Sequence, residues 1–70
     1  MDIRDGIKPS ILKSPYRQSA IAEAIGLNDQ QLSDIIGKRR KLDANEMLEF
    51  CKFIGITPNE LQEIAKAHSN

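Results

Sequence analysis

Residues 18–36 read QSAIAEAIGLNDQQLSDII, and they contain the pattern on which the predicted fold rests. Two segments with helical apolar spacing lie on either side of Gly26, a residue that tolerates positive φ in a tight turn. Ala22 is small enough to let the second segment cross the first steeply, and Leu27 is an apolar residue that the turn can tuck inward. These features predict two helices packed across one another through a tight turn.

The second of these helices, predicted from Asn28 to Ile36, has an apolar stripe and a polar face. Leu32, Ile35 and Ile36 form the stripe. The polar side chains around it are Asp29, Gln30, Gln31, Ser33 and Asp34. An outward polar face on a helix held by the fold is what the recognition helix of a helix-turn-helix requires, so these five residues are the predicted base contacts.

A helix-start pattern occurs three times in the chain. In each case a capping residue is followed three positions later by Glu or Gln, as in a capping box. The pairs are Asn28 with Gln31, Asp43 with Glu46, and Thr57 with Glu60. Helices are therefore predicted over 28–36, 43–54 and 57–67. A glycine follows three of the apolar segments, and the left-handed conformation of a helix end is predicted at each of them. These glycines are Gly26, Gly37 and Gly55.

Two shorter helices are predicted before Gly26. The first covers 9–13 and extends back towards Gly6, with Ile11 and Leu12 as its apolar residues. The second runs from about 17 to 25, and Ser14 is its substitute N-cap because Arg17 replaces the usual polar residue. No segment alternates like a strand. The predicted fold class is all-α: a compact five-helix bundle with a helix-turn-helix at about 17–36.

Length and composition limit the chain to one domain, 1–70, without covalent or metal cross-links. A single cysteine, Cys51, cannot form an internal disulfide, and with one histidine, His68, it cannot make a zinc site. Cys51 shares an apolar stripe with Met47, Leu48 and Ile54 and is predicted to be a core thiol. We expect no metal, no cofactor, no small-molecule substrate and no enzymatic activity, because no constellation of ionisable groups is evident.

The formal net charge is zero, but the charge is unevenly distributed. Lys38, Arg39, Arg40 and Lys41 are consecutive and directly follow the predicted recognition helix. Such a run is either an ordinary solvated surface or a set of phosphate contacts, and its position favours the second. The predicted phosphate contacts are Arg17, Gln18, Lys38, Arg39, Arg40 and Lys41.

With these residues in place, the chain resembles the lambda-repressor-like, or Cro-like, helix-turn-helix family, also called the XRE family. The resemblance covers roughly 11–61. It rests on residues within 18–35 and on 54–61, which reads IGITPNEL and is similar to the closing motif of the family. It implies a five-helix fold, homodimeric binding to palindromic operators in double-stranded DNA, and transcriptional repression in bacteria or their phages. It also implies a phosphate contact at Gln18 and base contacts at Asp29, Gln30 and Asp34.

One alternative follows from the acidic residues of the predicted recognition helix. Asp29 and Asp34 stand where the family often has neutral or basic residues, and carboxylates near phosphates are repelled. They are able to accept from a cytosine N4 amine. The alternative function is a protein-interaction module on the same fold, such as an antitoxin-type subunit or an adaptor, and the zero net charge favours it.

The last two helices supply the predicted dimer interface. Phe53 points away from the stripe of its own helix, so it is either a solitary exposed residue or a subunit contact. With Leu61 and Ile64 of the last helix it forms the predicted homodimer interface. No apolar run is long enough to span a bilayer, so we expect no membrane partner and a cytoplasmic location, nucleoid-associated in bacteria or phage-encoded.

Overall fold

Regular structure in residues 1–69, which the computed structural model describes, is entirely helical. A short 3-10 helix, η1 (Ile3–Gly6), leads directly into α1 (Ile7–Lys13). The other helices are α2 (Gln18–Ala24), α3 (Asp29–Ile36), α4 (Ala44–Ile54) and α5 (Pro58–Ala67). Five α-helices without a strand in this part of the chain agree with the predicted all-α class.

The helix starts of α3, α4 and α5 follow the predicted chemistry. Asn28, Asp43 and Thr57 are the N-caps, and each belongs to a complete capping box. In α3, for example, the Asn28 side chain accepts from the Gln31 N–H at 2.8 Å, and the Gln31 side chain accepts from the Asn28 N–H at 2.9 Å. The three predicted caps are confirmed.

The first helix extends back to Ile7, with Gly6 as its N-cap, so the predicted extension towards Gly6 is confirmed. The Asp2 side chain accepts from the Arg4 N–H and starts η1, a 3-10 helix that the sequence pattern did not predict. The prediction for Ser14 was wrong. Its hydroxyl donates to the Ile11 carbonyl at the end of α1, whereas Arg17 is the N-cap of α2 and makes no side-chain cap bond.

The glycines that follow the helices divide into two kinds. Gly26 and Gly55 have φ of 81° and 78°, as predicted. Gly37 has φ of −81°, so its predicted left-handed conformation was wrong. Its N–H still donates to the Ser33 carbonyl, which keeps it in a helical hydrogen bond. The left-handed residue is the next one, Lys38, with φ of 63°.

Every α-helix contributes to a single core. The largest fully buried side chains are Ile7, Ile21, Leu32, Ile35, Phe50 and Leu61. One core assignment from the sequence was wrong: Leu48 of α4 is 49% exposed, and Phe50 is buried beside Cys51 in its place. Leu12, an apolar residue of the predicted first helix, is 72% exposed. Phe50 completes the spacing of Met47, Cys51 and Ile54 along one face, whereas Leu48 lies about 100° around the helix from Met47.

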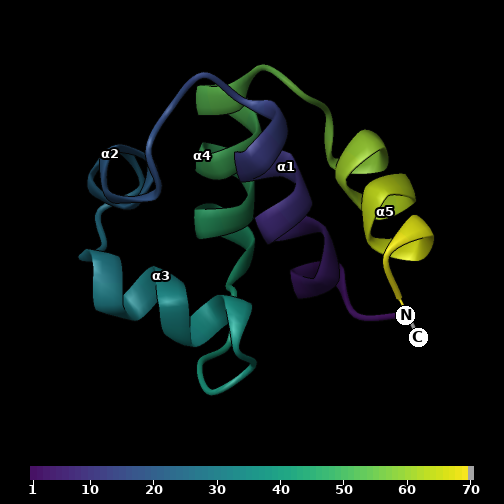
Figure 1. Ribbon diagram of the computed structural model, residues 1–70, viewed down its shortest axis with the longest axis horizontal. Coiled ribbons are helices and arrows are strands. Elements are labelled where there is room, and N and C mark those ends of the chain that lie inside the picture. Colours follow the sequence, from purple (N-terminus) through teal and green to yellow (C-terminus); the bar gives the residue numbers. More distant parts are fainter. Residues whose placement is uncertain (70) are drawn as a thin grey trace.

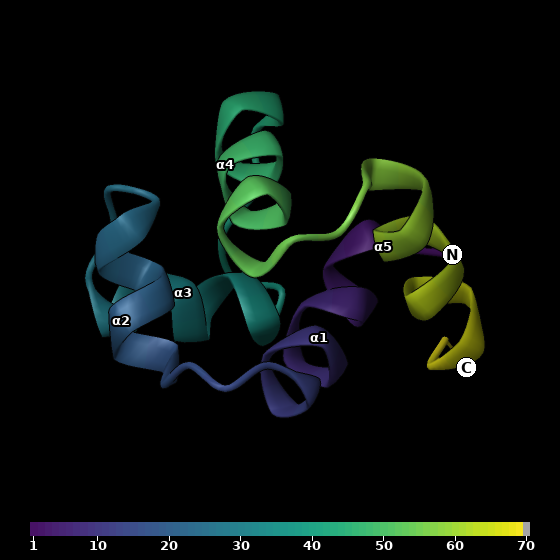
Figure 2. The same ribbon diagram turned by 90° about the horizontal axis from the view of Figure 1, so that it is seen from above.

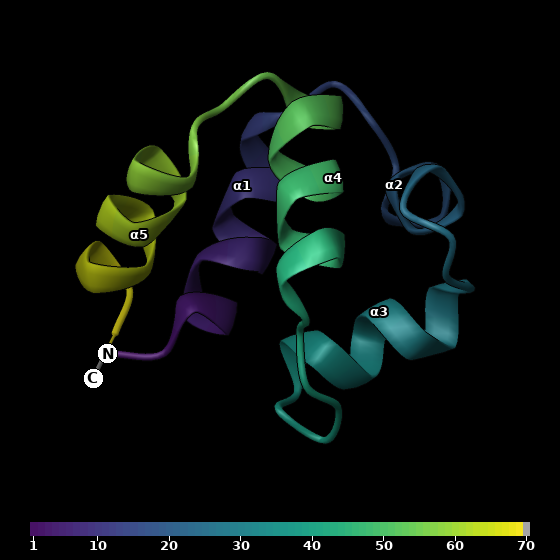
Figure 3. The same ribbon diagram turned by 180° about the vertical axis from the view of Figure 1, so that it is seen from behind.

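Two groups of helices are distinguishable in the views. Figure 1 shows α2 and α3 on one side and α5 on the other, with α1 and α4 overlapping between them. The view from above separates α4 from α1 in depth, and the view from behind again shows α5 on one side and α2 and α3 on the other (Figures 2 and 3). In Figure 1 α2 is seen almost end-on while α3 lies across the view, so consecutive helices cross steeply. No helix within residues 1–69 is long and apolar enough to cross a membrane.

Candidate nucleic-acid interface

The outward face of α3 is formed by Gln30 and Asp34. Both lie on the side of the helix opposite Leu32 and Ile35, which are fully buried. The Gln30 Nε2 donates to the Asp34 Oδ1 at 3.0 Å, so the two polar side chains form one continuous surface. Asp29, the first residue of α3, is exposed at one end of this surface.

The other two predicted base contacts carry internal hydrogen bonds. The Gln31 Oε1 is occupied by the Asn28 N–H of the capping box, and the Gln31 side chain is half-buried. Ser33 is also half-buried, and its hydroxyl accepts from the Gln18 Nε2 at 2.9 Å. These two residues therefore fix the start of α3 and its attachment to α2, and their exposed polar surface is smaller than predicted.

A chain of polar contacts joins α1, α2 and α3. Gln18, the first residue of α2, donates to Ser33 of α3 and accepts from the Lys8 Nζ of α1 at 3.3 Å. Lys8 is exposed and adds a cation next to Gln18, beside the exposed Arg17. The sequence pattern did not indicate Lys8, because it lies ten positions before Gln18 and only the packing of α1 brings the two side chains together.

The basic run is largely paired with carboxylates from other elements. Lys38 pairs with Asp5 at 2.7 Å, Arg39 with Asp34 at 3.1 Å, and Arg40 with Glu46 at 3.1 Å. Lys41 is exposed, and no ion pair of it is found within residues 1–69. Figure 1 shows this loop projecting beyond the end of α3. Local sequence gave no sign of the partner of Lys38, since Asp5 lies in η1, whereas Asp34 and Glu46 lie only five and six positions from Arg39 and Arg40.

The 3-10 helix η1 also contacts the loop that carries the basic run. The Arg4 Nη1 donates to the Arg40 carbonyl at 3.0 Å, next to the ion pair between Asp5 and Lys38. Arg4 also binds Asp2 through its side chain and its backbone N–H, and these bonds hold the pKa of the Asp2 carboxyl well below its usual range. The loop is therefore held in one conformation by contacts on two of its residues.

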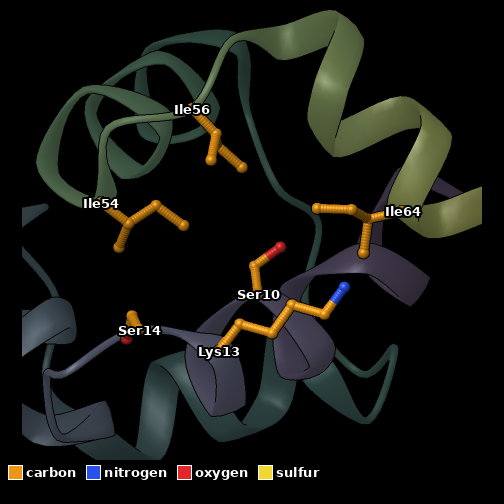
Figure 4. Close-up of a pocket in the computed structure, with 6 residues that line it drawn as sticks. All are labelled: Ser10, Lys13, Ser14, Ile54, Ile56 and Ile64. Atoms are coloured by element: carbon orange, nitrogen blue, oxygen red, sulfur yellow. The ribbon is translucent and has the colours of Figure 1, made fainter.

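The predicted dimer residues lie in three different environments. Phe53 is 37% exposed, and its ring lies 4.6 Å, centroid to centroid, from that of the exposed Tyr16. Leu61 is completely buried within the chain, so its assignment to an interface was wrong: the narrow stripe of α5 faces the core. Ile64 is half-buried and lines a cavity of about 110 Å³ together with Ile54 and Ile56 (Figure 4).

Within residues 1–69, no three or more His, Cys, Asp or Glu residues lie together as metal ligands would. Cys51 is buried as predicted, and this burial raises the pKa of its thiol. A thiol with a raised pKa is a poor nucleophile. The surface around α3 is therefore the candidate site.

Comparisons of the chain with models of protein families, with curated proteins and with solved structures gave no match in any of the three.

Proposed function

We propose that this protein is a sequence-specific, double-stranded-DNA-binding transcriptional regulator, a repressor of the Cro-like type, in which α2 and α3 form a helix-turn-helix. The observation that carries the proposal is the outward polar face of α3, where the exposed Gln30 and the half-buried Asp34 lie opposite the fully buried Leu32 and Ile35. A rigid helix with this face is able to present amide and carboxylate groups to base edges in a major groove.

The surroundings of α3 support this orientation. Gln18 and Lys8 lie at one edge of the surface, and Lys38 and Lys41 belong to the loop that follows α3. We assign them to the phosphates that flank the groove. Arg17 is exposed, and we assign it to a phosphate as well. Arg40 is partly buried and keeps its bond to Glu46, so its role is to support the loop. Phosphate contacts of this kind fix the register of a protein on its duplex.

The carboxylate partners of the loop are compatible with DNA binding. The Lys38 side chain is 45% exposed and the Asp5 side chain 17%, so a phosphate is able to approach Lys38 from the solvent side while the pair with Asp5 is kept. These carboxylate partners do lower the net positive potential of the surface. We therefore expect binding to depend strongly on salt, with a slope smaller than a run of four free cations would give.

The proposed regulator is a homodimer that binds a palindromic operator. Tyr16 and Phe53 form an exposed aromatic pair, and we assign the subunit contact to this pair in place of Leu61. A two-fold contact uses the same patch on both copies, so a single aromatic pair contributes twice. Two copies also double the limited DNA interface of a domain of this size.

The test is titration with duplexes selected from a random pool, repeated at several salt concentrations. We expect tight binding to a selected site, weaker binding to random duplexes, and affinity that falls steeply with salt. Gln30→Ala is expected to weaken binding to the selected site by about 1–3 kcal/mol. Gln62→Ala, an exposed glutamine on α5, is the matched control and is expected to bind like the parent.

Two results would contradict the proposal. A protein that shows no salt-dependent binding to any duplex is not a DNA reader, and the protein-interaction function on the same fold would then be favoured. Equal losses for Gln30→Ala and Gln62→Ala would remove the role of α3 even if the domain binds DNA.

A further inference from the structure

We infer that Asp34 and Arg39 act as one base-reading unit, in which the Asp34 carboxylate orients the Arg39 guanidinium towards a guanine in the major groove. The inference rests on the proposed DNA-binding function and deepens it. It moves Arg39 from the phosphate contacts predicted for the basic run to the residues that determine specificity.

Three donors converge on a single oxygen of Asp34. The Arg39 Nε and Nη2 both lie 3.1 Å from the Asp34 Oδ1, and the Gln30 Nε2 lies 3.0 Å from the same atom. The Arg39 N–H also donates to the Asp34 carbonyl at 2.7 Å. Arg39 is thus attached to the outward face of α3 through both its backbone and its side chain, which favours one direction of its guanidinium.

Gly37 provides the space in which this guanidinium lies. A Cβ atom at Gly37 would stand 2.5 Å from the Arg39 Nη1 and 2.9 Å from its Cζ. Any other residue at this position would push the guanidinium away from Asp34. The absence of a side chain at Gly37 and the carboxylate of Asp34 therefore define the same position for Arg39.

The outer edge of the guanidinium is available to a ligand. The Asp34 Oδ1 accepts from Nε and lies 3.1 Å from Nη2 in the ion pair, and no partner of Nη1 is found within residues 1–69. The Arg39 side chain is 64% exposed. The edge formed by the two terminal nitrogens matches the O6 and N7 acceptors of guanine, the commonest specific contact of arginine in DNA.

The carboxylate favours a base over a phosphate as the ligand of Arg39. A phosphate brought to the free edge would lie close to the negative charge of Asp34, whereas the guanine acceptors are uncharged. The Asp34 Oδ2, for which no hydrogen bond is found in the described residues, is able to accept from a cytosine N4 amine beside the guanine. The pairing with Arg39 thus gives Asp34 a function in DNA recognition.

The experiment compares four variants on the duplex selected by the parent protein, on that duplex with each guanine replaced in turn, and on random duplexes. Arg39→Ala is expected to weaken binding to the selected duplex roughly 5- to 150-fold and to remove the preference for guanine at one base pair. Arg39→Lys is expected not to restore that preference, because an ammonium lacks the two-nitrogen edge. Asp34→Asn should relax the same guanine preference while it strengthens binding to random duplexes. Lys52→Ala, an exposed cation on α4, is the control.

The outcomes separate this inference from the proposed function. If Arg39→Ala weakens all duplexes by the same factor and lowers the slope of log K against log salt by about 0.9, Arg39 binds a phosphate and the inference is overturned. In that case the DNA-binding function stands. Failure of the parent protein to select any duplex would overturn both, and thermal unfolding of each variant confirms that it is folded.

Discussion

Gly37 follows α3 and Gly55 follows α4, but the two positions favour glycine for different physical reasons. Gly55 has φ of 78°, a conformation that costs a residue with a Cβ about 1–2 kcal/mol. Gly37 has an ordinary φ of −81°, and the atoms nearest to a Cβ placed there belong to the Arg39 guanidinium. At Gly55 the constraint is the backbone, and at Gly37 it is the space needed by a side chain.

Alanine substitution is expected to separate these two constraints. Gly55→Ala should lower the free energy of unfolding by about 1 kcal/mol, because the left-handed conformation is strained. Gly37→Ala should change it by less than about 0.5 kcal/mol, since the loss of the exposed ion pair offsets the lower entropy of the unfolded chain. Urea unfolding of both variants measures this difference. Equal destabilisation would mean that Gly37 also needs its backbone freedom.

At the scale of the elements, what the sequence predicted well was local. Caps such as Asp43 and Thr57 involve partners three residues away, so a short stretch of sequence is enough to find them. The contact between Lys8 and Gln18 and the pairing of Lys38 with Asp5 depend on packing between helices, and no local pattern identifies them. Phe50 was missed for a different reason: two overlapping apolar stripes were possible in α4, one with Leu48 and one with Phe50, and only the contacts of the folded chain distinguish them.

The capping glutamates of α4 and α5 have unequal surroundings. Glu60 accepts only from the Thr57 N–H and is exposed, whereas Glu46 accepts from the Asp43 N–H and twice from Arg40, with a side chain 12% exposed. Glu46→Ala should therefore cost about 1.5–3 kcal/mol of stability, and Glu60→Ala about 0.5–1 kcal/mol. Chemical denaturation of both variants and of Arg40→Ala with Glu46→Ala tests this. Equal costs would mean that the ion pair adds nothing to the cap.

On the scale of the whole molecule, the aromatic pair of Tyr16 and Phe53 joins the link before α2 to the last turn of α4. Exposed apolar residues of this size are normal when they occur singly. Two rings in contact on one surface form a patch that a second copy is able to cover. The α4 helix also carries Leu48, which is 49% exposed and lies about 140° around the helix from Phe53, at about 100° per residue.

Phe53 and Leu48 provide a matched test of the proposed homodimer. Phe53→Asp is expected to abolish self-association and to weaken cooperative binding of two copies to a palindromic duplex. Leu48→Asp introduces the same charge at an exposed apolar position of the same helix and is expected to assemble like the parent. Analytical ultracentrifugation with and without the duplex measures both. Parental cooperativity in Phe53→Asp, or an equal loss in Leu48→Asp, would place the contact elsewhere.

The packing of η1 against α5 has a consequence for the synthesis of the protein. The backbone of Gly6 lies so close to α5 that a Cβ there would stand 2.8 Å from the Leu61 carbonyl oxygen and 3.1 Å from the Ala65 nitrogen. A ribosome releases η1 well before α5, and chain entropy opposes the closure of a loop this long. Ile7, which is fully buried in the finished protein, therefore stays accessible to chaperones and proteases until α5 has left the exit tunnel.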